Sequence, residues 1–169
     1  MSHAKPDLYD SFALYASGVT LVTVRDGDHD AYLVAASVLT ASVEPFSLAV
    51  SVSERREVLP AIEAGAPWAV SVLASHHELL SLRLAKRTHN GSAWDVLSAA
   101  GAERSPEGPL WLPDSLVTFW CSTRSLTPVH DQVLVVGDVQ RGSKSNAAAP
   151  LLRWNHGFHT VDADMAESL

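Results

Sequence analysis

Two adjacent arginines, Arg55 and Arg56, are the side chains in this sequence best suited to bind an anion. They follow Ser53, a residue type that commonly caps the first turn of a helix, and helix N-termini attract anions because their first amides lack partners. A guanidinium also forms paired hydrogen bonds to phosphate oxygens. The sequence therefore predicts an anion site at residues 53–57. The alternative is a solvated charge cluster of these arginines and the neighbouring glutamates.

The apolar segment 33–53 leads into this cluster. It is broken only at Glu44-Pro45, so we expect two strands joined at the proline. Small hydroxyl side chains recur along it, namely Ser37, Thr40, Ser42, Ser47, Ser51 and Ser53. Such a row suits a sheet face that hydrogen-bonds a ligand, and it is equally compatible with ordinary sheet hydroxyls.

Two further motifs resemble catalytic or nucleotide-binding sites but lack a required part. Residues 77–81 begin like a zinc-protease helix, yet a serine stands where the second histidine belongs, and a capping box at Ser75–Glu78 accounts for the glutamate. Residues 137–145 resemble a phosphate loop, but a serine separates the second glycine from the lysine. There is no GxGxxG motif. We therefore expect neither a metal site nor a Rossmann nucleotide site.

The single cysteine and two histidines near the end of the chain are also better explained without chemistry. Cys121 ends an apolar run and is expected to be a buried, unreactive thiol. His156 and His159 do not complete a metal site by themselves, so they are expected on a surface or a sheet. No side chain is therefore assigned as a catalytic residue.

Size and composition favour one globular domain that spans residues 1–169. The chain is 47% hydrophobic and shows no change in composition along its length. A formal net charge of −7 and only two short basic clusters argue against a nucleic-acid surface. There is no hydrophobic signal segment and no apolar run long enough to span a bilayer, so we expect a cytoplasmic protein without membrane attachment.

Hydrophobic periodicity and turn residues divide the chain into short elements. Helices are expected between Asp7 and Gly18, from Ser53 to Gly65, and from Ser75 onward. Strands are expected at residues 18–24, at two places in segment 33–53, and at 68–73, 116–122, 133–139 and 158–161. Residues 86–113 are rich in glycine and proline. They are expected to form a mobile excursion that holds one short helix near residues 94–100 and covers bound ligands.

Many short strands, few helices and no regular strand–helix alternation indicate a mainly β fold. The two architectures that fit are an antiparallel barrel and a sandwich, with helices on the outside. The residues alone thus predict a mainly β domain with one candidate anion site.

The order of these features resembles the flavin reductase-like family, the FMN-binding split barrels that include reductase components of two-component flavin-dependent monooxygenases. The similarity covers residues 12–161. It is carried in order by Ser17-Gly-Val-Thr20, Leu33-Val-Ala-Ala-Ser37, Ser42-Val-Glu-Pro45, Val58-Leu-Pro60, Trp68-Ala-Val-Ser-Val-Leu73 and Asp131-Gln-Val-Leu-Val-Val-Gly-Asp-Val139. The resemblance implies a mainly β, antiparallel split β-barrel with a few flanking helices.

The resemblance also implies where a flavin and a nicotinamide would bind. Flavin contacts are expected from Val34, Ala35, Ala36, Ser37, Ser51, Val52, Ser53, Arg55, Arg56, Ser71 and Arg83. The nicotinamide is expected near Asp131, Gln132, His156 and His159.

Three departures from the family pattern fall inside these segments. Val34 and Ala36 replace a flavin-contacting threonine and asparagine, and Gln132 replaces a histidine. Arg55 and Arg56 replace two serines beside the flavin phosphate, where charge-assisted hydrogen bonds would compensate for the lost donors.

Two functions are compatible with the resemblance. The first is an NAD(P)H-dependent flavin reductase that reduces FMN or FAD with NADH or NADPH and supplies reduced flavin to a partner monooxygenase, the cofactors carrying the chemistry. The second is a non-catalytic flavin-binding split-barrel protein, which the missing histidine and asparagine would suit. A homodimer is also expected, because exposed aromatics around Trp94 and Trp111 would otherwise lack cover.

Overall fold

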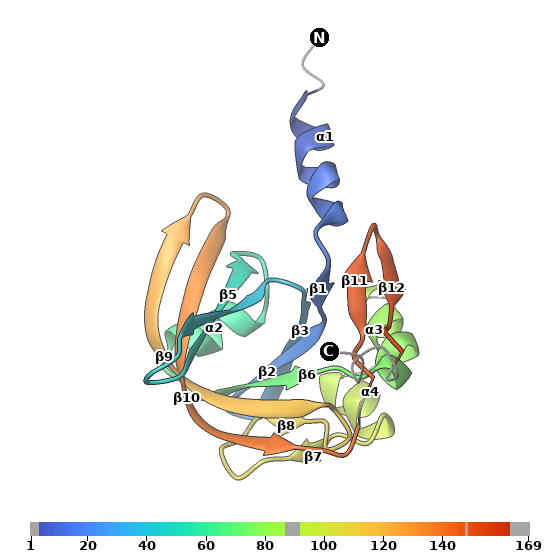
Figure 1. The fold of residues 1–169 in the computed structure, drawn as a ribbon. Helices are drawn as coiled ribbons and strands as arrows, with labels where there is room; N and C mark the ends of the chain where they lie inside the picture. Colours follow the sequence, from blue (N-terminus) through green and yellow to red (C-terminus); the bar gives the residue numbers. More distant parts are fainter. Residues whose placement is uncertain (1–3, 87–91, 148, 163–169) are drawn as a thin grey trace.

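One antiparallel sheet dominates the computed structural model, which describes residues 4–86, 92–147 and 149–162 (Figure 1). Its seven strands pair in the order β3-β2-β6-β9-β10-β5-β4, and every pair is antiparallel. They are β2 (Thr20–Asp26), β3 (His29–Ala35), β4 (Val38–Ser42), β5 (Ser47–Ser53), β6 (Trp68–Val72), β9 (Val117–Val129) and β10 (Gln132–Lys144). The predicted mainly β, antiparallel fold is confirmed.

Smaller elements flank this sheet. The remaining strands are β1 (Ser17–Gly18), β7 (Glu103–Arg104), β8 (Leu110–Trp111), β11 (Leu152–Trp154) and β12 (Gly157–His159). The helices are α1 (Ala4–Ser11), α2 (Val58–Glu63), α3 (Glu78–Ala85) and α4 (Ala93–Ala99), with the 3-10 turns η1 (Phe12–Leu14) and η2 (Ser75–His77). Strands β1, β11 and β12 form a separate three-stranded sheet. Within the described residues, no helix is both long enough and apolar enough to cross a membrane.

Two core clusters lie on either side of β2 and β3. The first contains alternate residues of the barrel strands together with α2, and the fully buried Trp68 is its largest side chain. The second contains Leu21 and Leu73 with residues of α3, α4 and β8. Cys121 belongs to the first cluster, and burial raises the pKa of its thiol to about 12, so the prediction of an unreactive buried cysteine is confirmed.

The closest backbone approach in the first cluster is at Gly137 of β10, beside a shift in the β9–β10 register. A Cβ on this residue would clash with the indole ring of Trp68 and lie 3.0 Å from the Cβ of Cys121. Glycine therefore lets β10 cross the face of the tryptophan.

Strands β4 and β5 are joined across Glu44-Pro45 as predicted, but segment 33–53 also contains the end of β3, which stops at Ala35, so it holds parts of three strands and not two. Several of its hydroxyls serve the sheet itself. Ser37 Oγ donates to the Ser51 carbonyl at 3.1 Å, and the buried Ser47 donates to Asp138 Oδ1 at 2.8 Å. For Ser37 and Ser47, the interpretation as ordinary sheet hydroxyls is therefore correct.

The predicted helix starts were wrong in three places. The first helix begins at Ala4 rather than Asp7, and its side chains Leu8 and Tyr9 are exposed. Ser53 does not cap a helix, because α2 starts only at Val58 and has no side-chain cap. At the third site, Ala74 rather than Ser75 precedes the first turn, and its amide donates to His77 Nδ1 at 3.1 Å.

The predicted excursion at residues 86–113 contains more structure than expected. The short helix near 94–100 is present as α4, and a β7–β8 hairpin follows it. Leu97, Leu110 and Leu112 are buried in the second core cluster, so residues 92–113 are packed against the body. The expected mobile part at residues 87–91 lies outside the described residues.

Candidate functional site

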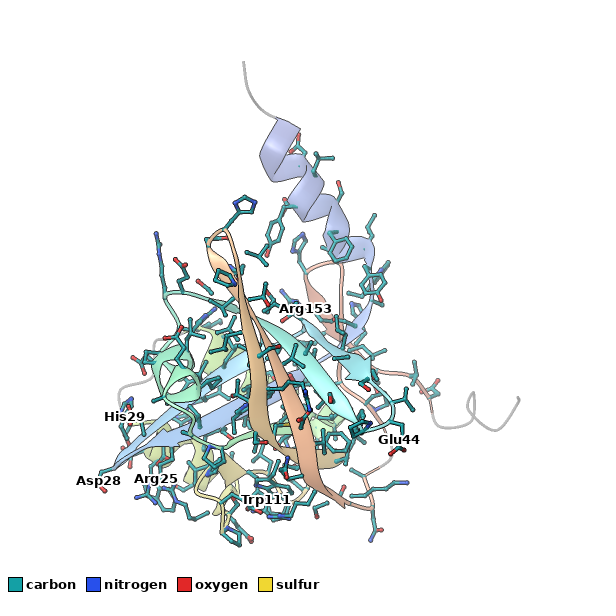
Figure 2. The ribbon with its side chains drawn as sticks, turned by 90° about the vertical axis from the view of Figure 1, so that its left-hand side faces the viewer. Arg25, Asp28, His29, Glu44, Trp111 and Arg153 are labelled. Atoms are coloured by element: carbon teal, nitrogen blue, oxygen red, sulfur yellow. The ribbon has the colours of Figure 1, made fainter. Side chains whose placement is uncertain are left out.

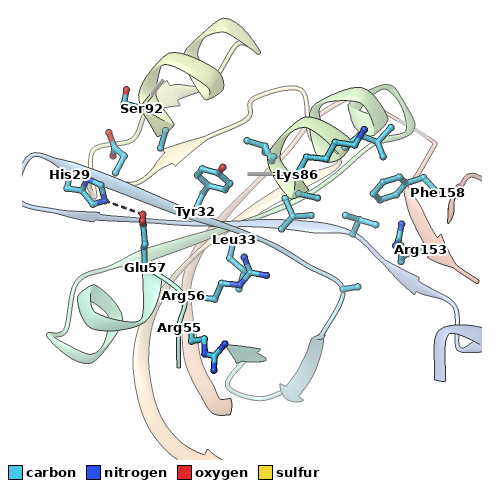
Figure 3. Close-up of a pocket in the computed structure, with 18 of the residues that line it drawn as sticks. His29, Tyr32, Leu33, Arg55, Arg56, Glu57, Lys86, Ser92, Arg153 and Phe158 are labelled. Atoms are coloured by element: carbon cyan, nitrogen blue, oxygen red, sulfur yellow. Dashed lines mark ion pairs between the residues drawn. The ribbon is translucent and has the colours of Figure 1, made fainter. Parts of the chain in front are cut away.

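A cavity of about 850 Å³ lies between β3, the turn before α2, the end of α3 and the β11–β12 hairpin (Figure 3). This volume falls in the range of small-molecule and cofactor pockets. Strand β3 contributes the floor. Its alternating pattern leaves Tyr32 and Val34 half-exposed on one face and buries Leu33 on the other, and all three side chains line the cavity.

The turn at residues 54–57 supplies Arg55 and Arg56 to one part of the cavity wall. Three hydrogen bonds fix this turn: the Arg56 amide donates to the Ser53 carbonyl at 3.0 Å, the Arg55 amide to Ser53 Oγ at 3.4 Å, and the Glu54 amide to the Asp131 carbonyl at 3.1 Å. Ser53 thus organises the arginines through a turn instead of through a helix cap. Arg56 is half-buried and Arg55 is exposed.

The charge of the cavity is positive although the chain as a whole carries −7. Its cationic lining consists of Arg55, Arg56, Lys86 and Arg153, and its carboxylates are Asp30 and Glu57. Both carboxylates have cationic or ionisable partners of their own. Glu57 lies 3.5 Å from His29, and Asp30 receives two hydrogen bonds from Arg104, one of 2.8 Å, which raise the pKa of that guanidinium. The cavity therefore favours an anionic ligand.

Apolar side chains separate the cationic groups. Leu33, Val34, Leu82, Leu84 and Phe158 line the cavity together with the cations. Figure 3 shows Leu33 beside the arginine turn and Phe158 beside Arg153. Cations at the edges and an apolar middle suit a ligand that combines a phosphate with a flat, largely apolar ring.

A second cluster of ionisable groups lies outside this cavity. Asp114 accepts from Nε2 of His76 at 2.8 Å and of His77 at 3.1 Å. His77 Nδ1 already accepts the Ala74 amide proton, so its Nε2 carries the proton and has no lone pair to offer a metal. Burial lowers the pKa of His77, which keeps this ring neutral. The cluster is a hydrogen-bonded link between η2 and the segment after β8.

Some of the predicted flavin contacts line the cavity and others do not. Val34, Ala36, Arg55 and Arg56 lie in the wall. The residues outside the wall are Ala35, Ser37, Ser51, Val52, Ser53, Ser71 and Arg83. Of these, Val52 and Ser71 have no exposed surface, and the Ser71 hydroxyl hydrogen-bonds Thr118 at 3.0 Å.

The predicted nicotinamide residues separate into two groups. Gln132 begins β10 opposite Ser53, and Asp131 directly precedes it, next to the arginine turn. His156 and His159 lie on the β11–β12 hairpin, where His156 lines the cavity and His159 hydrogen-bonds the Trp154 carbonyl at 3.1 Å. The structure does not bring these four side chains together.

Sequence reasoning missed several cavity residues, including His29, Tyr32, Lys86, Arg153 and Phe158. The alternation along β3 could have identified Tyr32, which shares a face with Val34. Arg153 had no comparable signal, because β11 is only three residues long.

Known proteins resemble this chain over nearly its whole length. The model of the family described as flavin reductase like domain matches residues 12–162. The chain belongs to the flavin reductase-like family. It is 30% identical to the reductase component of 4-hydroxyphenylacetate 3-monooxygenase from Thermus thermophilus, over 90% of this chain and 93% of that protein. It is 31% identical to the NADH:riboflavin 5'-phosphate oxidoreductase of Streptomyces pristinaespiralis, over 89% and 85% of the two chains.

The fold agrees with a solved member of the flavin reductases. The flavin reductase component of a bacterial two-component tryptophan halogenase superposes with a TM-score of 0.84 at 23% identity, over 93% of this chain and 98% of that one. The predicted family, the split-barrel fold and the enzyme class, an NAD(P)H:flavin oxidoreductase, are confirmed. The cavity fits a flavin nucleotide, because its cations suit the phosphate and its apolar middle suits the ring.

Proposed function

We propose that this flavin reductase oxidises NADH, reduces FMN in the cavity beside β3, and releases reduced FMN to a partner monooxygenase. The observation that supports this most strongly is a cationic cavity with an apolar middle, found in a chain whose family model spans residues 12–162. We choose NADH and FMN over NADPH and FAD for this proposal because the name of a relative that is 31% identical contains NADH and riboflavin 5'-phosphate, which is FMN. The oxygenase partner follows from the name of the Thermus relative.

The residues of the chain bind and orient the two substrates, while a bound flavin supplies the hydride-accepting chemistry. Arg55 and Arg56 bind the phosphate. Val34, Ala36 and Leu84 would contact the flavin ring and exclude water from it. His156, which also lines the cavity, would lie near the nicotinamide.

Steady-state NADH consumption tests this function. Wild-type protein is expected to consume NADH only when FMN is added, at a rate proportional to the protein concentration. A non-catalytic flavin-binding protein would instead bind FMN without NADH consumption. Replacing FMN by FAD and NADH by NADPH ranks the preferences in the same assay.

We also propose a homodimer in which the N-terminal arm, residues 7–15, packs against a second copy. Leu8, Tyr9, Phe12, Leu14 and Tyr15 are 62% to 84% exposed. Figure 2 shows α1 standing clear of the body. The β9–β10 hairpin rises from the same end of the molecule and exposes Leu126 and Val129 (Figures 1 and 2). Two exposed apolar surfaces at one end suit a two-fold contact.

Trp94 and Trp111 both have partners within their own chain, although Trp94 is still 45% exposed. Trp111 packs edge-to-face on Trp120 at 5.1 Å and lies at the end of the molecule opposite α1, and Trp94 is stacked by Arg104. Light scattering should give about twice the chain mass of 18.1 kDa, and serine at Leu8, Phe12 and Tyr15 should reduce that value. A wild-type mass of one chain at micromolar concentration would refute the dimer.

We propose further that the 169 residues act as one domain in the cytoplasm. Residues of β2 and β3 pack in or against both core clusters, so the two clusters are joined by these strands. The location follows from the proposed electron donor, a pyridine nucleotide of the cytoplasm. Fractionation of cells that produce the protein would test it.

A further inference from the structure

Arg153 faces the cavity from a rigid position away from the arginine turn. Its strand β11 is the middle strand of the small sheet, paired with β1 at Ser17 and with β12 at Phe158. The guanidinium lies over the Phe158 ring at 4.9 Å from the centroid. Figure 3 places both side chains at the end of the cavity away from Arg55 and Arg56.

Four described arginines outside the cavity, at positions 25, 104, 124 and 141, pair with carboxylates. The arginine at position 83 is exposed to solvent. Within the described part of the chain, no carboxylate lies within ion-pair distance of Arg153, which is half-buried. A stacked, partly desolvated guanidinium without a counter-ion is a favourable site for a planar anion or a carbonyl edge.

The edge of a flavin ring that such a group can bind is determined by chemistry. One edge of the ring carries two methyl groups, and the other is a pyrimidine edge with two carbonyl groups that accept hydrogen bonds. Only the pyrimidine edge is complementary to a guanidinium, which has donors and no acceptor. With the phosphate on Arg55 and Arg56, contact with Arg153 fixes the second end of the ligand.

Reduction changes the charge at that same edge. Hydride transfer from C4 of the dihydronicotinamide to N5 of the flavin moves two electrons and one proton. The nicotinamide is oxidised to NAD⁺, and the flavin is reduced and gains one negative charge, shared between N1 and the C2 carbonyl oxygen. A fixed cation at the pyrimidine edge therefore binds the product more tightly than the oxidised substrate.

On the basis that the cavity binds FMN as set out above, we propose that Arg153 binds the pyrimidine edge of the flavin and stabilises the charge that reduction places there. The test compares Arg153→Met and Arg153→Lys with the wild type. The matched control is Arg25→Met, which removes the same charge outside the cavity. Dissociation constants are measured anaerobically for oxidised FMN and for FMN reduced with dithionite.

In Arg153→Met, the affinity for reduced FMN is expected to fall about tenfold more than the affinity for oxidised FMN. This ratio corresponds to a midpoint potential of bound FMN lowered by about 30 mV. Arg153→Lys should recover most of the shift because it keeps the charge, and Arg25→Met should show none. Thermal unfolding verifies that the variants fold, and Arg153→Gln replaces the methionine variant if that one does not.

Two outcomes would overturn the assignment. Equal losses for oxidised and reduced FMN, with an unchanged potential, would mean that Arg153 does not sense the charge on the ring. Unchanged FMN affinities with a raised KM for NADH would place Arg153 at the nicotinamide nucleotide. Dithionite replaces NADH as the reductant, so the FMN affinities test the role of Arg153 without NADH. A wild type that binds FMN but does not oxidise NADH would therefore refute the proposed function, and the FMN affinities would still decide the role of Arg153.

Discussion

Replacing Arg56 by alanine should weaken FMN binding selectively through the phosphate. Arg56 is half-buried in the cavity wall, and its backbone is fixed by the turn on Ser53. A hydrogen bond to a charged group in such a setting contributes about 1.5 to 3 kcal/mol. We therefore expect the dissociation constant for FMN to rise by about one to two orders of magnitude.

Arg55 provides an internal comparison, because it lies in the same turn but is exposed. Solvent screening limits exposed ion pairs to about 0 to 1 kcal/mol, so Arg55→Ala should change the dissociation constant by at most about fivefold. Arg25→Ala is the control outside the cavity and should have no effect.

Titration of flavin fluorescence with each variant measures these constants for FMN and for riboflavin. Riboflavin has no phosphate, so its affinity for Arg56→Ala should equal that for the wild type. The phosphate assignment is wrong if Arg56→Ala binds FMN as tightly as the wild type, or if it loses FMN and riboflavin affinity equally.

Two further predictions concern stability. Gly137→Ala should lower the free energy of unfolding by about 1 to 3 kcal/mol, because its Cβ would clash with Trp68, whereas Gly18→Ala has no neighbour within 4 Å and should be near neutral in chemical denaturation. Equal stabilities of the two variants would contradict the packing at Gly137. Burial lowers the pKa of His77 below 6.5, so the unfolded chain binds a proton more readily there, and stability should fall as the pH drops below about 6.5. His77→Gln should flatten this part of the pH profile, and parallel profiles would show that His77 does not contribute.

The strands were largely predictable because their signal is local. Segment 33–53 and residues 68–73 alternate or run apolar as barrel strands do, and the structure places β4, β5 and β6 there. The same reasoning missed the lengths of β9 and β10, whose C-terminal halves are mostly exposed. Their pairing with each other, rather than their composition, extends them.

The helix starts failed because side-chain capping was inferred from residue type alone. Ser53 accepts an amide within a tight turn before α2. Ser75 lies inside the first turn of its segment, and the amide of the preceding Ala74 donates to His77. Local sequence does not determine which nearby acceptor an amide finds.

The cavity was only partly predictable because it joins segments far apart in the chain. Arg55 and Arg56 were identified by their charge and Val34 by family resemblance, and all three line the cavity. Arg153 arrives there through the pairing of β11 with β1, a contact across more than 130 residues that no local pattern reports.

The central claim is that the protein reduces FMN as a substrate with electrons from NADH. It is tested most directly under anaerobic conditions with a catalytic amount of protein, excess FMN and excess NADH. Loss of the visible absorbance of oxidised flavin counts the FMN molecules that are reduced. We predict that each protein molecule reduces many equivalents of FMN. Reduction of at most one equivalent, or a rate no higher than without protein, would contradict the proposed function.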